Sequence, residues 1–276
     1  MGWHGHLQLD YHRDGERTGA FDRHDGPMRV LQRLYPEGPG VCHHVLVHPP
    51  GGIVGGDRLA LTLTLGEGSH ALVTTPGATR YYRSGGEAAL QALDARLAGG
   101  ARLEWLPLET LAYSGCIAEN RMRFALAPGA EMIGWDLLAL GLPAADAAFE
   151  RGCFTQHVEL PGHWLERGRI DATDQRLLDS PLGWAGRRVM AMLWFGSGSA
   201  MSDARREALL DTARAQVAGH PLAATAGATS PGPCVVLLRV LAPRVEPAMQ
   251  LLTRVWARWR EQAWALPACP PRVWHT

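Results

Sequence analysis

The chain has 276 residues, which is long enough to bury a sizeable core as one large β domain or two smaller ones. Its formal net charge is zero and it contains no lysine, so the charge balance gives no electrostatic indication of a nucleic acid or an anionic membrane as partner. No apolar run approaches the roughly 20 residues that span a bilayer, and the first residues lack the basic and apolar regions of a signal peptide. We therefore expect a soluble, cytoplasmic protein.

The N-terminal residues alternate in the pattern of a half-buried strand. Over residues 3–12, apolar side chains fall on one face, and His4 and His6 fall on the other. Histidines two positions apart on a strand can share a divalent metal, but they are also typical of a solvated face, which is the interpretation we favour. Asp14 and Gly15 then predict a hairpin turn into a second strand at 17–23.

The stretch from His48 to Ser84 is the most unusual part of the sequence. Pro49 and Pro50 end the strand before them, and the four glycines at 51, 52, 55 and 56 permit a tight loop. A strand at 58–65 follows, with leucine at every second position. A phosphate-binding loop would instead open a helix, and the chain has no P-loop lysine. The residues alone therefore indicate a rigid structural turn.

A strand, a glycine-containing turn and a second strand recur three times after this loop, at 61–72, 95–105 and 124–133. The units lie roughly 30 residues apart, a period typical of stacked supersecondary units. We interpret each unit as a hairpin that buries one face against its neighbours. The repeat therefore predicts a β-rich, solenoid-like stack.

The C-terminal half combines further strands with two helices. Strands are predicted at 153–160, 164–171, 189–195 and 235–241. One helix begins after Ser202 as N-cap and stops at Gly219, and a second begins near Pro247. Residues 222–233, rich in Ala, Thr, Gly and Pro, are predicted to form a mobile loop.

The second helix offers candidates for a partner interface. We place Arg254, Arg258, Arg260 and Glu261 on its exposed side, with Trp256 nearby. Tryptophan and arginine are enriched at protein interfaces, which makes Arg254, Trp256 and Arg258 the candidates, although packing against the stack is the commoner fate of such a helix.

The five cysteines are odd in number and contain no Cys-x-x-Cys motif. They therefore indicate reduced, mostly buried thiols rather than disulfides or a structural zinc site. Cys42 beside His43 is a candidate soft-metal contact, although a small apolar residue on a buried strand is the more common role for Cys42.

The sequence contains no recognisable catalytic motif. It has no Gly-x-Ser-x-Gly elbow, no lysine for a Schiff base and no His-Glu-x-x-His. Acidic residues are plentiful, so a pair of catalytic carboxylates stays open. A metal-dependent hydrolase on a β-solenoid is therefore the alternative to a non-enzymatic role.

Further motifs are distributed over nearly the whole chain. They are Tyr35-Pro36-Glu37-Gly38, Cys42-His43, His48-Pro49-Pro50-Gly51-Gly52, Val54-Gly55-Gly56-Asp57, Thr74-Thr75-Pro76-Gly77-Ala78-Thr79, Tyr82-Arg83-Ser84, Leu103-Glu104-Trp105-Leu106-Pro107 and the closing run from Pro267 to Trp274. Together they resemble the urease accessory proteins of the D type, called H in some bacteria. The resemblance implies a β-helical fold, in agreement with the repeat. We therefore expect an all-β-dominated, solenoid-like stack with two α-helices in the C-terminal third, forming one domain over 1–276.

The resemblance also implies a role without catalysis. Proteins of this family bind the urease apoprotein and the F-type accessory protein, which recruits the G-type GTPase that carries nickel. Nickel is thought to pass through a water-filled passage inside the D-type protein. We therefore expect a nickel-insertion scaffold, or chaperone, with nickel in transit and no tightly bound cofactor. The sequence leaves open whether this chain is dimeric within the complex.

Residues on the implied passage follow from the family motifs. They are the acids Asp57, Asp136 and Glu166, with Thr74, Thr75 and Ser84 as weaker candidates for lining hydroxyls. A conduit must bind Ni²⁺ weakly enough to release it, and isolated carboxylates and hydroxyls with retained water meet that need. For Asp57 and Glu166, a salt bridge to the adjacent arginine or a turn hydrogen bond is an equally acceptable role.

Two segments depart from the family pattern. Residues 106–109 read Leu-Pro-Leu-Glu and residues 141–146 read Gly-Leu-Pro-Ala-Ala-Asp, so both lack polar groups usual in relatives. Any partner or metal contact by these two loops is therefore in doubt.

Overall fold

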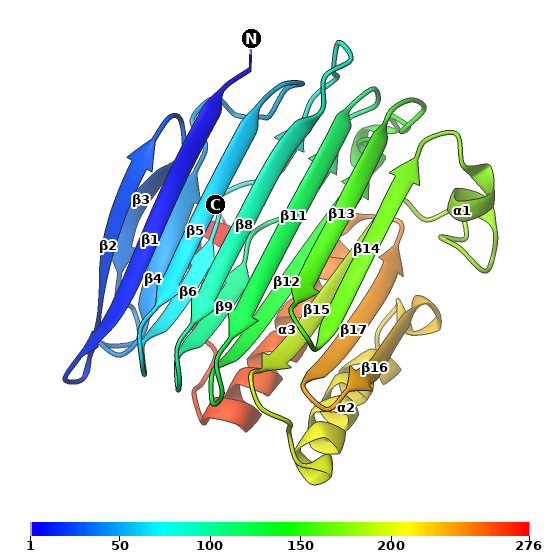
Figure 1. The fold of residues 1–276 in the computed structure, drawn as a ribbon. Coiled ribbons are helices and arrows are strands. Elements are labelled where there is room, and N and C mark those ends of the chain that lie inside the picture. Colours follow the sequence, from blue (N-terminus) through cyan, green and yellow to red (C-terminus); the bar gives the residue numbers. More distant parts are fainter. Residues whose placement is uncertain (1, 276) are drawn as a thin grey trace.

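The computed structural model describes residues 2–275, and within them two β-sheets face each other while helices cover the back of the second sheet (Figure 1). The first sheet runs in the order β14-β13-β11-β8-β5-β1-β2. Its strands are β1 (His4–Asp14), β2 (Arg17–Asp25), β5 (Arg58–Leu65), β8 (Ala89–Leu97), β11 (Ile117–Leu126), β13 (Cys153–Leu160) and β14 (Trp164–Asp171). In Figure 1 it is the front layer, from β2 on the left to β14 on the right.

The second sheet runs in the order β16-β17-β15-β12-β9-β6-β4-β3, the short strand β10 pairs with β12, and β7 pairs with β10. Its strands are β3 (Arg29–Leu34), β4 (Cys42–Val47), β6 (His70–Thr74), β7 (Thr79–Tyr81), β9 (Arg102–Leu106), β10 (Thr110–Ala112), β12 (Glu131–Leu140), β15 (Val189–Ser197), β16 (Ala226–Gly232) and β17 (Val235–Ala242).

The repeated units build the stack, which confirms the predicted solenoid-like fold. The two strands of each unit lie in different sheets, however, so the interpretation of the units as hairpins is wrong. β5, β8 and β11 pair in parallel in the first sheet, while β6, β9 and β12 do so in the second. The connecting turns carry Gly68, Gly100 and Gly129 at positive φ, which favours glycine. Each turn leads the chain across to the opposite sheet.

Apolar side chains are buried in two layers. One core lies between the sheets, and the other lies between the second sheet and the helices. The first sheet has only one buried face, so β1 and β5 alternate between apolar and polar residues. The second sheet is covered on both sides, and β12 is therefore buried at nearly every position.

The two predicted helices are confirmed. α2 (Asp203–Ala218) begins after Ser202, whose hydroxyl accepts a hydrogen bond from the Arg205 amide at 3.3 Å, and it ends at Gly219. α3 (Val245–Trp264) carries Pro247 in its first turn. Both pack on the outer face of the second sheet (Figure 1). None of the helices within residues 2–275 is long and apolar enough to cross a membrane.

The prediction of a mobile loop at 222–233 is wrong. A single 3₁₀ turn, η2 (Ala223–Thr225), leads into β16, which pairs with β17. Ser230 Oγ donates a hydrogen bond to Val235 O at 2.8 Å, and Thr225 Oγ1 donates one to Leu241 O at 2.7 Å. The segment therefore forms a strand because it pairs with the edge of β17, although its composition is typical of a loop. The short α1 (Gln175–Asp179), η1 (Pro143–Ala145) and η3 (Arg272–His275) were not predicted.

Candidate functional site

A row of amide side chains crosses the core between the two sheets. Gln91 of β8, Asn120 of β11 and Gln156 of β13 stand at the same register on three neighbouring parallel strands. All three side chains lie on the face that points to the second sheet, so they form one row, here called the amide row. Opposite it, Asp136 of β12 accepts a hydrogen bond from Gln156 Nε2. Polar groups therefore interrupt an otherwise apolar core.

The amide row is connected with the surface. An inner cavity of about 60 Å³ is lined by Gln91, Asn120 and Asp136, among others. An outer cleft of about 270 Å³ opens beside it and shares Gln91, His48 and several further lining residues with the inner cavity. One water needs roughly 10–15 Å³ of such space, so the inner cavity has room for several.

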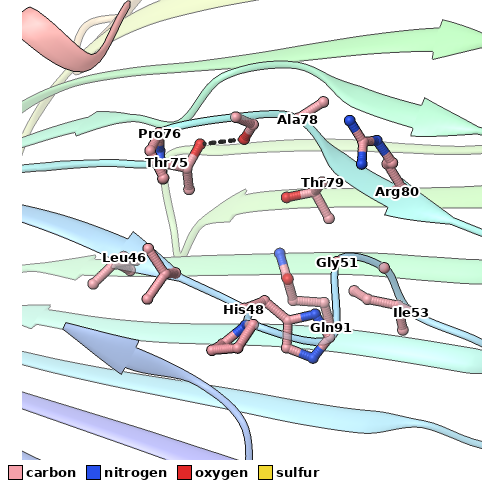
Figure 2. A pocket seen from close by; sticks show the side chains of 14 residues that line it. Leu46, His48, Gly51, Ile53, Thr75, Pro76, Ala78, Thr79, Arg80 and Gln91 are labelled. Atoms are coloured by element: carbon pink, nitrogen blue, oxygen red, sulfur yellow. Dashed lines mark hydrogen bonds between the residues drawn. The ribbon is translucent and has the colours of Figure 1, made fainter. Parts of the chain in front are cut away.

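The glycine-rich stretch of the sequence forms the mouth of the outer cleft. Gly51, Gly52 and Ile53 lie on one side, and residues 75–80 lie on the other. Figure 2 shows His48 beside Gln91, with Thr79 and the loop that carries Thr75 across the cleft. The rigid turn predicted from Pro49, Pro50 and the glycines therefore shapes the mouth of an internal cavity.

Some buried polar atoms between the two sheets have no hydrogen-bond partner in the protein. Within residues 2–275, four buried side-chain atoms have no hydrogen-bond partner, namely Tyr81 Oη, Trp105 Nε1, Asn120 Oδ1 and Trp194 Nε1. All four belong to side chains between the two sheets, and those of Trp105 and Asn120 line the inner cavity. Leaving such an atom dry costs about 1–3 kcal/mol. Water in the interior would satisfy them.

The interior favours neutral groups. Burial raises the pKa of Asp136 to about 7, although a hydrogen bond with the backbone of Leu137 acts to lower it. Burial also raises the pKa of Tyr81, and the nearby charge of Asp136 adds to this effect. At the mouth, burial lowers the pKa of His48. Asp136 is thus a carboxyl that changes charge near neutral pH beside a row of neutral amides.

The structure separates the three acids of the expected passage. Only Asp136 reaches the inner cavity. Asp57 is buried in the turn before β5, where its carboxylate accepts hydrogen bonds from the amides of Trp3 at 2.7 Å and Val54 at 2.9 Å. Glu166 forms an ion pair with Arg239, not with the adjacent arginine, at the far edge between β14 and β17.

The three hydroxyl candidates also differ in position. Thr75 lines both the outer cleft and the inner cavity, and its Oγ1 accepts a hydrogen bond from the Leu108 amide at 2.9 Å. Thr74 faces the helix side, where it accepts a hydrogen bond from Trp274 Nε1 at 2.8 Å and donates one to Leu106 O. Ser84 closes its own turn through Glu87 O and the Gly86 amide. Of these side chains, Thr75 is the one beside the cavity.

The proposed metal contacts are not brought together. His43 Nε2 lies 2.6 Å from Glu37 Oε1, whereas Cys42 Sγ lies 3.9 Å from His44 Nε2, because consecutive residues of β4 point to opposite faces. His4 and His6 are exposed on the outer face of β1, as expected for a solvated face. Within residues 2–275, no group of three or more His, Cys, Asp or Glu side chains is spaced to hold a metal ion.

The interface candidates on α3 divide into two faces. Arg254 and Arg258 are exposed, and Arg254 lines a groove of about 890 Å³ between α3 and the two segments that depart from the family pattern. Trp256 and Arg260 are fully buried, which corrects their placement on or near the exposed side. Trp256 Nε1 donates a hydrogen bond to Glu104 Oε2 at 2.6 Å.

Sequence reasoning missed the amide row. Its signal is present in the sequence, because Gln91 and Asn120 take equivalent positions in successive repeats, where other inward positions are apolar. A polar residue that recurs at one inward position of a repeat indicates a continuous polar layer in the stack.

Replacement of Asp57 tests whether it is structural. Asp57→Ala leaves two amide donors without their acceptor, so we expect the free energy of unfolding to fall by about 1–3 kcal/mol. Asp57→Asn keeps one acceptor oxygen and should lose less. Urea denaturation measures both, and an unfolding free energy unchanged in the alanine variant would refute the turn-stabilising role.

The architecture defines a class of protein, a two-sheet β-solenoid with a helical layer on one side and a polar interior that opens to the surface. Comparison with known proteins specifies it further. The family model described as UreD urease accessory protein matches residues 4–275. Urease accessory protein UreD of Leptothrix cholodnii is 64% identical over 278 residues, and that of Variovorax paradoxus is 61% identical over 276 residues, in each case across 100% of both chains. The UreD protein of Paracidovorax citrulli is 61% identical over 274 residues, covering 99% of each chain. The chain belongs to the UreD family of urease accessory proteins.

Proposed function

We propose that this chain is a non-catalytic scaffold in urease maturation that passes Ni²⁺ through its interior to the urease apoprotein. In this proposal it binds the apoprotein on one surface and the F-type accessory protein on another, and it meets the G-type GTPase through the F-type protein, in the cytoplasm. Family membership supports the link to urease. The observation that supports the passage is the inner cavity beside the amide row, which adjoins the open outer cleft and is lined by Asp136.

The side chains that line the inner cavity suit an ion in transit. Amide oxygens, hydroxyls and retained water coordinate a divalent cation weakly, whereas several histidines or thiolates would hold Ni²⁺ too tightly for release. Asp136 supplies a single carboxyl to the lining of the inner cavity. Asp57, which is committed to its turn, is no longer part of the proposed route.

The alternative of a metal-dependent hydrolase gains no supporting observation. Such an enzyme needs convergent metal ligands or an activated nucleophile. The acids singled out from the sequence lie apart, and two of the three are engaged in a turn and in an ion pair. The hydrolase is therefore not proposed.

Reconstitution tests the scaffold role directly. The chain is co-expressed with the F-type and G-type accessory proteins and urease apoprotein, and the complex is examined by size-exclusion chromatography and nickel-dependent urease activation. We expect a co-eluting complex whose activation requires this chain. Activation that proceeds equally well without the chain would refute the proposal.

A further inference from the structure

The segment between β14 and β15, residues 172–188, folds as a small unit at the edge of the stack. In Figure 1 it carries α1 and projects beyond β14 on the right. Leu178 and Trp184 are buried at its base and join the core between the two sheets. The segment is therefore anchored to the fold, and we call it the knob.

The tip of the knob holds an apolar side chain in solvent. Leu182 is 100% exposed, whereas none of the other large apolar side chains within residues 2–275 exceeds 60%. Single exposed apolar residues are common on protein surfaces, so exposure alone does not indicate an interface. The shape and the charge of the knob supply the further evidence.

Hydrogen bonds fix the tip in one shape. Ser180 accepts one from the Gly183 amide at 2.9 Å through its carbonyl oxygen and one from the Leu182 amide at 3.2 Å through its hydroxyl. Below the tip, Arg188 forms an ion pair with Asp179 at 2.7 Å. A side chain displayed on such a turn loses little backbone freedom when a partner covers it, which is a property of interface anchors.

The charge of the knob is unbalanced outside its own contacts. Both of its carboxylates are engaged, because Asp174 caps α1 and Asp179 pairs with Arg188. Arg176 and Arg187 are exposed, and neither forms an ion pair with any of residues 2–275. They precede and follow Leu182 in the same small unit. A surface that covers the knob is therefore favoured if it carries carboxylates.

We propose that the knob is a docking site for a protein partner in urease maturation, and that Leu182 enters an apolar pocket on this partner whose rim carries carboxylates. This inference rests on the scaffold role proposed above and adds a contact residue to it. A second copy of this chain fits less well, because the apolar groove of about 890 Å³ beside α3 is lined by two arginines as well as by two glutamates.

Titration calorimetry tests the apolar contact. The chain is titrated separately with urease apoprotein and with the F-type accessory protein. Leu182→Ala should weaken binding to one of them about tenfold, which corresponds to about 1.4 kcal/mol. Leu165→Ala is the matched control, because Leu165 is a leucine 56% exposed at the other end of β14, and it should bind as the wild type does.

A double variant tests the charge. Arg176→Glu combined with Arg187→Glu turns two carboxylates toward the expected acidic rim, so the same partner should bind at least about tenfold more weakly. The difference should shrink at high salt, where charges on a surface are screened. All these substitutions change exposed side chains, so the free energy of unfolding in urea should stay at the wild-type value.

The outcomes separate this inference from the proposed function. If Leu182→Ala binds both proteins as tightly as the wild type, the knob is not a docking site, although the scaffold role stands. A loss of binding that comes with a loss of stability, or that Leu165→Ala shares, also refutes the proposal. Self-association that Leu182→Ala abolishes in analytical ultracentrifugation would make a second copy the occupant and overturn the proposed partner. A wild-type chain that binds neither protein would overturn the proposed function and this inference with it.

Discussion

Replacing Arg260 with alanine is expected to lower the free energy of unfolding by about 3–5 kcal/mol, since it leaves the buried carboxylate of Glu104 without its cation. Arg260 is fully buried between α3 and the second sheet. Its Nε donates a hydrogen bond to Glu104 Oε1 at 3.1 Å, and its other nitrogens bond Glu37 and the Pro267 carbonyl. Glu104 is itself fully buried, so solvent cannot compensate its charge when the guanidinium of Arg260 is removed.

The negative charge of Glu104 depends on the hydrogen-bond donors and the cation around it. Burial by itself would raise the pKa of Glu104, but the hydrogen bond from His70, the charge of Arg260 and the hydrogen bond from Trp256 outweigh burial and hold the pKa below its usual value. Without Arg260 the carboxylate retains only His70 and Trp256, at 2.8 and 2.6 Å. The C-terminal segment also loses its tie at Pro267.

Arg258→Ala is the matched control on the same helix. Arg258 is 62% exposed and pairs with Glu261 on the surface, where such a pair contributes less than about 1 kcal/mol. Urea denaturation of the two variants at constant pH should therefore separate them by at least 2 kcal/mol. Similar unfolding free energies for Arg258→Ala and Arg260→Ala would show that the buried ion cluster does not stabilise the fold.

The position of Arg260 also shows where sequence reasoning fails. Charged side chains usually lie at the surface, so the residue type placed Arg260 on the exposed side of α3. The helical period indicates the opposite, because Trp256 and Arg260 follow Leu252 at intervals of four and so extend the apolar face. Only the three-dimensional arrangement of Glu37, Glu104 and α3 reveals the partners that make its burial possible.

The fold itself was predictable to a larger extent. The repeat of about 30 residues predicted the stack, and the alternation of apolar and polar residues placed seven strands within a few residues of their observed bounds, namely β1, β2, β5, β13, β14, β15 and β17. Sequence could not show that each unit bridges two sheets, because a hairpin and a bridging turn have the same local pattern. For the site, Asp57 and Asp136 both look like acids beside apolar strands, and only the backbone amides of Trp3 and Val54 distinguish the first.

Replacing Asp136 with asparagine is expected to change how stability depends on pH. Burial raises the pKa of Asp136 to about 7 in the folded protein, from about 3.9 in an unfolded chain. Between these values the unfolded state has lost the proton that the folded state keeps, so folding takes up a proton. The stabilising effect of the protonated carboxyl is complete below about pH 4 and is lost as pH rises to about 7. A shift of this size corresponds to roughly 4 kcal/mol.

Asparagine has nearly the same shape and keeps an oxygen for the Gln156 amide, but it does not titrate. Other groups also contribute to the pH dependence: burial lowers the pKa of His44 to about 4, so His44 makes stability rise with pH up to about 6.5. The difference between wild type and Asp136→Asn cancels such contributions. We therefore expect urea denaturation between pH 5 and 8 to show the variant gaining stability relative to wild type up to about pH 7 and remaining level above it. A difference that does not vary with pH would mean that Asp136 is already ionised throughout this range, in a site hydrated well enough to hold the charge.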